Sequence, residues 1–206
     1  NSEQMKLLKK GELDVTFTRH NSNSDEIESL FVLREPLIFI LPENHPLAKY
    51  ERIPVKALNG IDFIIPAAEQ SLTLHNAILD FAKANGIEFN IVQKADNILF
   101  NINSIGMGLG CTILPGYVAP LTTSNSVIRT LDVELPYLDL YVSYHKNSSS
   151  VAVQKFIELL TRVFYLNINR DWSIFYNFSF PIQHTIISLV NSSVFFWPIL
   201  IIFLSH

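Results

Sequence analysis

The sequence contains a single cysteine, Cys111, and no dense run of basic residues. One cysteine excludes an internal disulfide, and its place inside the apolar run Gly110–Leu114 favours a small buried core residue. The net charge is −4. The densest basic cluster, Lys6, Lys9 and Lys10, is typical of the solvated face of a short helix. Phosphate contacts require more Lys and Arg than this, so the chain alone is not expected to bind DNA.

The patterns that carry catalysis or metal binding are also missing. Four histidines, His20, His45, His75 and His145, are scattered without an H-E-x-x-H pair. There is no G-x-S-x-G nucleophile motif, and no pair of carboxylates stands at a fixed spacing. The chain is therefore expected not to be an enzyme, and neither a metal nor a cofactor is predicted.

Charged residues are absent from the end of the chain, where the last two are Arg170 and Asp171. The stretch Thr185–Leu204 has the length that a membrane span needs. The polar cluster Asn191–Ser193 at its midpoint is costly in hydrocarbon, and no basic residues flank it. Residues 167–206 are thus expected to lie outside the domain, as read-through, an out-of-frame extension or a fusion scar. A membrane anchor through residues 185–204 is the alternative.

The body of the chain alternates apolar runs with helical patterns, which is typical of an α/β domain with largely parallel strands. Strands are predicted at Leu13–Thr18, Leu37–Leu41, Asp62–Ile65, Phe89–Val92, Cys111–Leu114, Val127–Leu131 and Leu138–Tyr144. Helices are predicted at Gln4–Lys10, around Leu74–Phe81 and Ile98–Ile105, and at Val151–Phe164. The glycines Gly106, Gly108 and Gly110 follow a helix and lack the lysine of a phosphate-binding loop, so they predict a helix end with close packing.

Three motifs resemble those of LysR-type transcriptional regulators. Gly11-Glu12-Leu13-Asp14-Val15 resembles the family's step into a strand of its first regulatory lobe. Glu35-Pro36-Leu37, with the following Leu41–Ala48, resembles the crossover into the second lobe. Gly106–Gly110 with Leu114-Pro115 resembles a helix-to-strand step of that lobe. Each motif alone is weak, but their order and spacing match from about Gln4 to Tyr165. Within the family, Arg19-His20, Asn90–Gln93, Asn97–Leu99 and Gly106–Tyr117 are similar to the regulators of phenylpropionate and cinnamate dioxygenase genes.

The resemblance implies a periplasmic-binding-protein-like fold of two α/β lobes with an effector held between them. Residues 1–40 would form part of the first lobe, residues 41–136 the complete second lobe, and residues 137–166 the return strand and helix. The family's DNA-binding domain, linker helix and opening strand and helix have no counterpart, so the chain is expected to be truncated at its N-terminus. Contact with DNA would then require the missing N-terminal domain. A cytoplasmic location and a homo-oligomer are implied for the full-length family.

The resemblance also implies a small aromatic carboxylate as the effector. Open α/β sheets bind ligands beyond the carboxyl ends of their strands, where helix N-termini offer free N–H groups. Ser71 and Thr73 follow a strand and would present hydroxyls to a carboxylate, or simply cap the next helix. Arg19 ends a first-lobe strand and is a cation suited to an organic anion. Asp96 is expected to cap a helix rather than contact the ligand. The predicted effector-binding residues are Arg19, Glu69, Gln70, Ser71, Thr73, Asn97, Pro115 and Tyr117.

Two other classes of protein share some of these features. A periplasmic-type solute-binding protein has the same fold, but the chain opens on the polar segment Asn1–Gly11 rather than on a secretory signal. A non-functional fragment, the poorly folding product of a decayed gene, is the other alternative. The first residue is Asn1 rather than Met, so the start is expected to be the interior of a longer protein. Translation of the DNA just upstream distinguishes a regulator from a transport protein: a helix-turn-helix indicates the first and a signal peptide the second. Limited proteolysis tests the fragment, since an intact second lobe should leave a resistant core.

Overall fold

The computed structural model describes residues 2–165, which divide between two compact units. Unit 2 is the continuous segment Arg34–Leu138, and unit 1 contains the residues up to Leu33 and from Asp139 onward. The predicted tail at residues 167–206, with the stretch considered as a membrane anchor, lies outside the described residues. Between residues 2 and 165, no helix combines the length and the apolar character that crossing a membrane requires.

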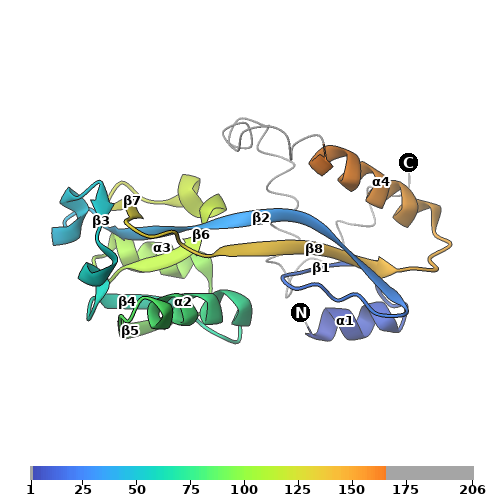
Figure 1. Ribbon diagram of the computed structural model, residues 1–206, viewed down its shortest axis with the longest axis horizontal. Helices are drawn as coiled ribbons and strands as arrows, with labels where there is room; N and C mark the ends of the chain where they lie inside the picture. The colour runs from blue at the N-terminus through green and yellow to red at the C-terminus, as the bar shows by residue number, and fades with distance from the viewer. Residues whose placement is uncertain (1, 166–206) are drawn as a thin grey trace. The chain divides into compact units, whose positions relative to one another are not determined.

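The elements alternate along the chain as Figure 1 shows. The α-helices are α1 (Ser2–Lys9), α2 (Leu72–Ala84), α3 (Ile98–Gly106) and α4 (Val151–Tyr165). The short 3-10 helices are η1 (Pro46–Lys49), η2 (Val55–Leu58) and η3 (Gly116–Leu121). The strands are β1 (Val15–Thr18), β2 (Ile27–Pro42), β3 (Arg52–Ile53), β4 (Asp62–Pro66), β5 (Asn90–Ala95), β6 (Thr112–Pro115), β7 (Ser126–Leu131) and β8 (Tyr137–His145). Both β2 and β8 contribute residues to each unit.

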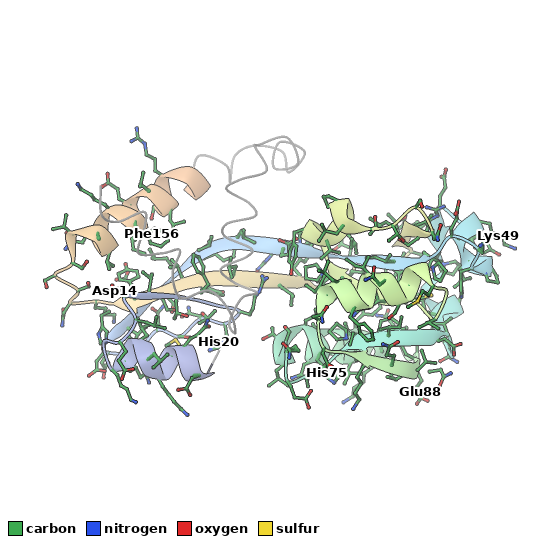
Figure 2. The ribbon with its side chains drawn as sticks, turned by 180° about the vertical axis from the view of Figure 1, so that it is seen from behind. Asp14, His20, Lys49, His75, Glu88 and Phe156 are labelled. Atoms are coloured by element: carbon green, nitrogen blue, oxygen red, sulfur yellow. The ribbon has the colours of Figure 1, made fainter. Side chains whose placement is uncertain are left out.

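Unit 1 is built on β1, which pairs antiparallel with β8 from Val15 opposite Tyr144 to Thr18 opposite Tyr141. In Figure 1, α1 and α4 lie on opposite sides of these strands. Apolar residues recur at helical spacing along α4 and form a stripe on one face of the helix. This stripe packs on Leu140 and Val142 of β8. Phe156 of α4 (Figure 2) meets Phe17 edge to face, with ring centroids 6.5 Å apart. Packing on α4 therefore closes one face of the unit 1 strands.

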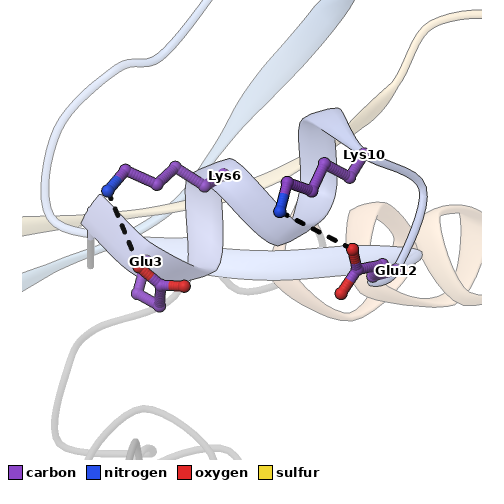
Figure 3. A network of polar contacts seen from close by, with 4 residues as sticks. All are labelled: Glu3, Lys6, Lys10 and Glu12. Atoms are coloured by element: carbon purple, nitrogen blue, oxygen red, sulfur yellow. Dashed lines mark ion pairs between the residues drawn. The ribbon is translucent and has the colours of Figure 1, made fainter.

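The basic cluster of α1 is a solvated face, as its sequence pattern predicts. Lys6 pairs with Glu3 at 3.7 Å and Lys10 with Glu12 at 3.8 Å, and all four side chains are well exposed (Figure 3). Exposed pairs of this kind contribute little to stability, typically about 0–1 kcal/mol. They do place an acidic group beside two of the three lysines, which argues further against this helix as a phosphate-binding surface.

In unit 2, β4 and β5 form a two-stranded parallel sheet, and β6, which pairs with β2, begins beside β4, in the order β5-β4-β6. β4 pairs with β5 from Asp62 opposite Asn90 to Pro66 opposite Ala95. A parallel bridge between Phe63 and Cys111 joins β4 to the start of β6. Since β5 and β6 flank β4, right-handed connections place α2 and α3 on opposite faces of these strands. A core of buried apolar residues from the strands and both helices fills the unit, including Phe63, which stacks on Phe89 with centroids 4.0 Å apart.

The prediction of largely parallel pairing is right for the centre of unit 2 and wrong for the long strands. β2 pairs antiparallel with both β6 and β7, and β1 pairs antiparallel with β8. Parallel neighbours need a crossover connection, usually a helix, between them. β2 and β8 are instead continuous strands with residues in both units. β2 is also longer than predicted, because its first half, from Ile27, carries polar residues that interrupt the apolar pattern.

The glycines after α3 end the helix and permit close packing, as predicted. Gly108 has a φ of +81°, the left-handed conformation that glycine adopts without strain. A Cβ built on Gly110 would lie 2.8 Å from the backbone oxygen of Asp62, so only glycine fits against β4 there. The next residue, Cys111, is fully buried, which confirms its prediction as a core residue.

Candidate functional site: the carboxyl edge of unit 2

The parallel strands of unit 2 end on one edge. Six of the eight predicted effector residues follow these strands, and a seventh, Pro115, is the last residue of β6. β5, β4 and β6 end at Ala95, Pro66 and Pro115, respectively. The chain leaves β4 toward β5 on one side and returns to β6 on the other, so the strand order reverses between β4 and β6. In open α/β sheets this reversal leaves a crevice outside the carboxyl ends of the two strands, where ligands bind. We call this region the carboxyl edge.

The turn after β4 leads into the N-terminus of α2. Gln70 and Ser71 both donate their backbone N–H groups to the oxygen of Ala67, at 3.1 and 3.2 Å. The Ser71 hydroxyl then caps α2 by accepting from the N–H of Leu74 at 3.4 Å. Thr73 is the second residue of α2, so its alternative role as the cap is wrong. By helix geometry, the N–H groups of Leu72 and Thr73 have no acceptor within α2, and they remain as anion donors.

The other two residues predicted in this turn are exposed. Glu69 and Gln70 lie at the surface between β4 and the Ser71 cap. Thr73 is partly buried, as is Ser71. Hydroxyls and backbone donors are therefore gathered at the start of α2, while the carboxylate of Glu69 belongs to the solvated part of the turn.

The residues after β5 start α3 in the same manner. Asn97 caps α3, because its side-chain oxygen accepts from the N–H of Phe100 at 2.8 Å. The expectation that Asp96 caps this helix is wrong; the two neighbouring residues are both good caps, and the extended backbone of Asn97 decides between them. Asn97 is exposed, and the N–H groups of Ile98 and Leu99 have no acceptor within α3.

The turn after β6 has a different cap. Pro115 precedes η3 and has no side-chain hydrogen bond to offer it. Instead, the Glu35 carboxylate of β2 accepts from the backbone N–H of Tyr117 at 3.0 Å. The antiparallel register pairs Leu37 with Pro115, so it brings Glu35 opposite Tyr117 two residues further along each segment. Pro115 is buried and Tyr117 partly buried against the unit 2 core.

His75 belongs to the same edge, although the sequence did not point to it as a site residue. Its Nδ1 lies 2.8 Å from the backbone oxygen of Pro66, the last residue of β4. A carbonyl oxygen only accepts, so Nδ1 donates in this contact. The histidine, labelled in Figure 2, lies in α2 four residues after the Ser71 cap, the spacing at which helical residues are neighbours. That i, i+4 relation to a predicted residue is the signal that could have found it.

Arg19 is the one predicted effector residue that belongs to unit 1. It directly follows the last residue of β1 and is partly buried. Its role as an effector contact stays a prediction.

In the part of the chain that the structure describes, Cys111 is buried and the histidines do not gather into a metal-binding group. Burial, with the nearby charge of Asp62, raises the pKa of Cys111 to about 12, so its thiol stays protonated. Within residues 2–165, no cluster of three or more His, Cys, Asp or Glu side chains is placed to hold a metal ion. His45 has a structural role, since its Nδ1 accepts from the N–H of Leu47 at 3.2 Å and caps η1.

Two α/β units that share two long strands, with helix N-termini gathered at a reversal of strand order, define a domain of the periplasmic-binding-protein-like class. Residues 1–164 match the family model of the LysR substrate binding domain. The chain belongs to this family, which confirms the resemblance found in its motifs.

Among curated relatives, the chain is similar to transcriptional regulators. The Hca operon transcriptional activator HcaR of Escherichia coli (strain K12) is 34% identical over 159 residues, covering 77% of this chain and 54% of that protein. The HTH-type transcriptional regulator CatR of Pseudomonas putida is 24% identical over 160 residues, covering 78% of this chain and 55% of that protein. The chain thus spans about half the length of the curated relatives it matches.

Solved structures with the same fold include ligand-bound domains. The BenM effector binding domain with its effector benzoate superposes with a TM-score of 0.69 at 14% identity, covering 83% of this chain and 78% of that chain. The effector binding domain of QuiR in complex with shikimate has a TM-score of 0.68 at 20% identity, covering 80% of this chain and 78% of that chain. At these identities the likeness shows the fold alone.

Proposed function

We propose that this domain senses a small aromatic carboxylate for a transcription regulator, and that the effector binds at the carboxyl edge of unit 2. The observation that carries the proposal is the N-terminus of α2 at the point where the strand order reverses. There the N–H groups of Leu72 and Thr73, which have no acceptor within the helix, follow the hydroxyl cap Ser71, and Thr73 itself carries a hydroxyl. This is the donor set that a carboxylate requires.

Two further observations support an aromatic acid. Tyr117 is partly buried against the core of unit 2 and gives the turn after β6 an aromatic surface, while Pro115 is buried. The solved domains that share the fold include one whose title names benzoate as its effector and one whose title names shikimate. An anion at α2 and an apolar body at η3 together match a ring that carries a carboxylate.

Regulation would follow from differential affinity. A ligand that binds one arrangement of the two units more tightly than another shifts the population toward that arrangement. In a complete regulator this shift would alter DNA contacts made by a separate helix-turn-helix segment, and a homo-oligomer and a cytoplasmic location belong to the same proposal. The role is sensing rather than catalysis, since the polar groups of the carboxyl edge are caps and donors without an activated nucleophile.

Isothermal titration calorimetry of the 206-residue chain with trans-cinnamate and 3-phenylpropionate tests the proposal. We expect saturable binding that Thr73→Val weakens about tenfold, the loss expected for one hydrogen bond to a charged group. Thr130→Val is the matched control, because Thr130 is exposed on β7, which is not one of the three strands of the carboxyl edge, and its hydroxyl donates to the backbone oxygen of Glu51. Absence of binding by a folded chain, or equal weakening by both variants, would contradict the proposal.

A further inference from the structure

On the basis of the proposed function, we infer that Glu35 makes the effector site selective for acids with a single carboxylate. The part of the ligand that reaches the turn between β6 and η3 is then uncharged. Glu35 lies on the crossover strand β2, and its carboxylate is bonded to a residue of that turn. It therefore acts as a specificity-determining residue through the Tyr117 N–H.

The three helix N-termini of the carboxyl edge are not equivalent. Neutral side chains cap α2 and α3, namely Ser71 and Asn97. Neither helix has an acidic residue in its first turn. Asp96 directly precedes the cap of α3, which leaves α2 as the N-terminus best suited to an external anion.

The N-terminus of η3 already holds an internal anion. Glu35 Oε1 accepts from the Tyr117 N–H at 3.0 Å, and the proline before η3 supplies no competing cap. The fit is close: a Cβ built on Gly116 would lie 3.3 Å from Glu35 Oε1 and 3.2 Å from the Pro36 oxygen. A ligand carboxylate in this turn would have to displace a like group from the same donor, at the cost of a charge-assisted hydrogen bond.

The surface around that donor suits an uncharged group. The side chain of this turn that a ligand can reach is Tyr117, which is partly buried against the unit 2 core, while Pro115, Gly116 and Val118 are buried. A ring, or an uncharged substituent of a ring, can contact this surface without losing hydration of a charge. The ligand's carboxylate is then directed to α2 and its apolar end to η3.

Two acids with the same skeleton test the inference: trans-cinnamate and 4-carboxycinnamate, which adds a second carboxylate at the far end of the ring. We expect the natural chain to bind cinnamate at least about tenfold more tightly than the diacid in calorimetric titrations, the equivalent of one charge-assisted hydrogen bond. Glu35→Gln keeps an oxygen acceptor but removes the charge, and Glu35→Ala frees the Tyr117 N–H. The preference should fall in both variants, and further in Glu35→Ala.

Glu88→Gln is the matched control, since Glu88 is an exposed carboxylate before β5, at the opposite end of the parallel strands. It should leave the ratio of the two affinities unchanged. If circular dichroism shows that Glu35→Ala is unfolded, the ratio in Glu35→Gln decides the question. Equal affinity for both acids in the natural chain, or an unchanged ratio in the folded Glu35 variants, would overturn the role of Glu35 and leave the effector site standing. Binding of neither acid would overturn the proposed function and this selectivity with it.

Discussion

Ser29 of β2 and Ser143 of β8 hold their hydroxyl oxygens 2.6 Å apart inside unit 1, although 114 residues separate them in the chain. Ser143 is fully buried, and the Ser29 oxygen also accepts from the backbone N–H of Ser22 at 3.1 Å. The two hydroxyls therefore connect two strands and the polar loop after β1. Such a contact is specific because a buried polar group without a partner is costly.

Substitution Ser143→Ala should lower the free energy of unfolding by about 1–3 kcal/mol, because it leaves a buried hydroxyl of Ser29 with one partner fewer. Urea unfolding followed by circular dichroism measures the change. Ser149→Ala, in the exposed loop before α4, is the control and should stay within about 0.5 kcal/mol of the natural chain. Equal stabilities of the two variants would show that the hydroxyl pair contributes nothing.

The caps of α2 and α3 should each contribute to stability independently of any ligand. Ser71→Ala and Asn97→Ala remove the acceptors for the Leu74 and Phe100 N–H groups, and each should cost about 1 kcal/mol. Ser71→Asp, which keeps a cap, should restore the unfolding midpoint in urea. It would also place a carboxylate at the proposed anion position and weaken cinnamate binding. A Ser71→Asp chain that is stable and binds as tightly as before would place the anion elsewhere.

Gly110 and Gly106 offer a contrast between rigid and adjustable neighbours. Gly110→Ala would bring a methyl group within 2.8 Å of the Asp62 backbone oxygen, whereas Gly106→Ala would meet the Thr123 hydroxyl at 2.8 Å. A side chain can rotate away and a strand backbone cannot, so Gly110→Ala should cost about 1–3 kcal/mol and Gly106→Ala clearly less. Thermal unfolding of the two variants tests the order, and the reverse order would refute it.

His45 should make stability depend on pH. Burial lowers the pKa of His45 from its ordinary value, with Asp62 acting in the opposite direction. The unfolded chain then binds more protons than the folded chain below about pH 6.5, so stability is full above that pH and falls as the pH drops through it. Protonation of Nδ1 would also remove the cap of η1.

Urea midpoints of the natural chain and of His45→Asn between about pH 8 and pH 5 measure this effect. Asparagine can cap η1 but does not titrate in this range, so the variant should lose less stability than the natural chain on acidification. Identical losses in the two proteins would assign the pH dependence to other groups.

The parts of the fold that the sequence predicts are those set by local patterns. The stripe of α4 and the apolar strand Asp62–Ile65 could be placed because burial follows helical or strand periodicity there. The first half of β2 could not, because Glu28, Ser29 and Arg34 break its pattern. Its antiparallel pairing is with strands that are distant in the sequence, and no local pattern predicts it.

The candidate site divides in the same way. The polar turns before α2 and α3 could be found from capping residues that follow a strand, although Asp96 and Asn97 could not be told apart by residue type. The contact of Glu35 with Tyr117 joins residues 82 positions apart and depends on the register of β2 against β6. Only the proline before η3, which cannot provide a cap, hinted that an acceptor must come from elsewhere.

The continuous course of unit 2 has a consequence for synthesis of the protein. Every residue of Arg34–Leu138 is synthesised before the second segment of unit 1 and leaves the ribosome ahead of it. Unit 2 can therefore complete its own core during translation, while β1 and the start of β2 wait for β8 and α4. Once unit 2 has folded, Arg34 and Leu138 at its two ends are held in place. The two segments of unit 1 are then connected by a folded unit rather than by a long flexible loop, which lowers the entropy cost of bringing them together.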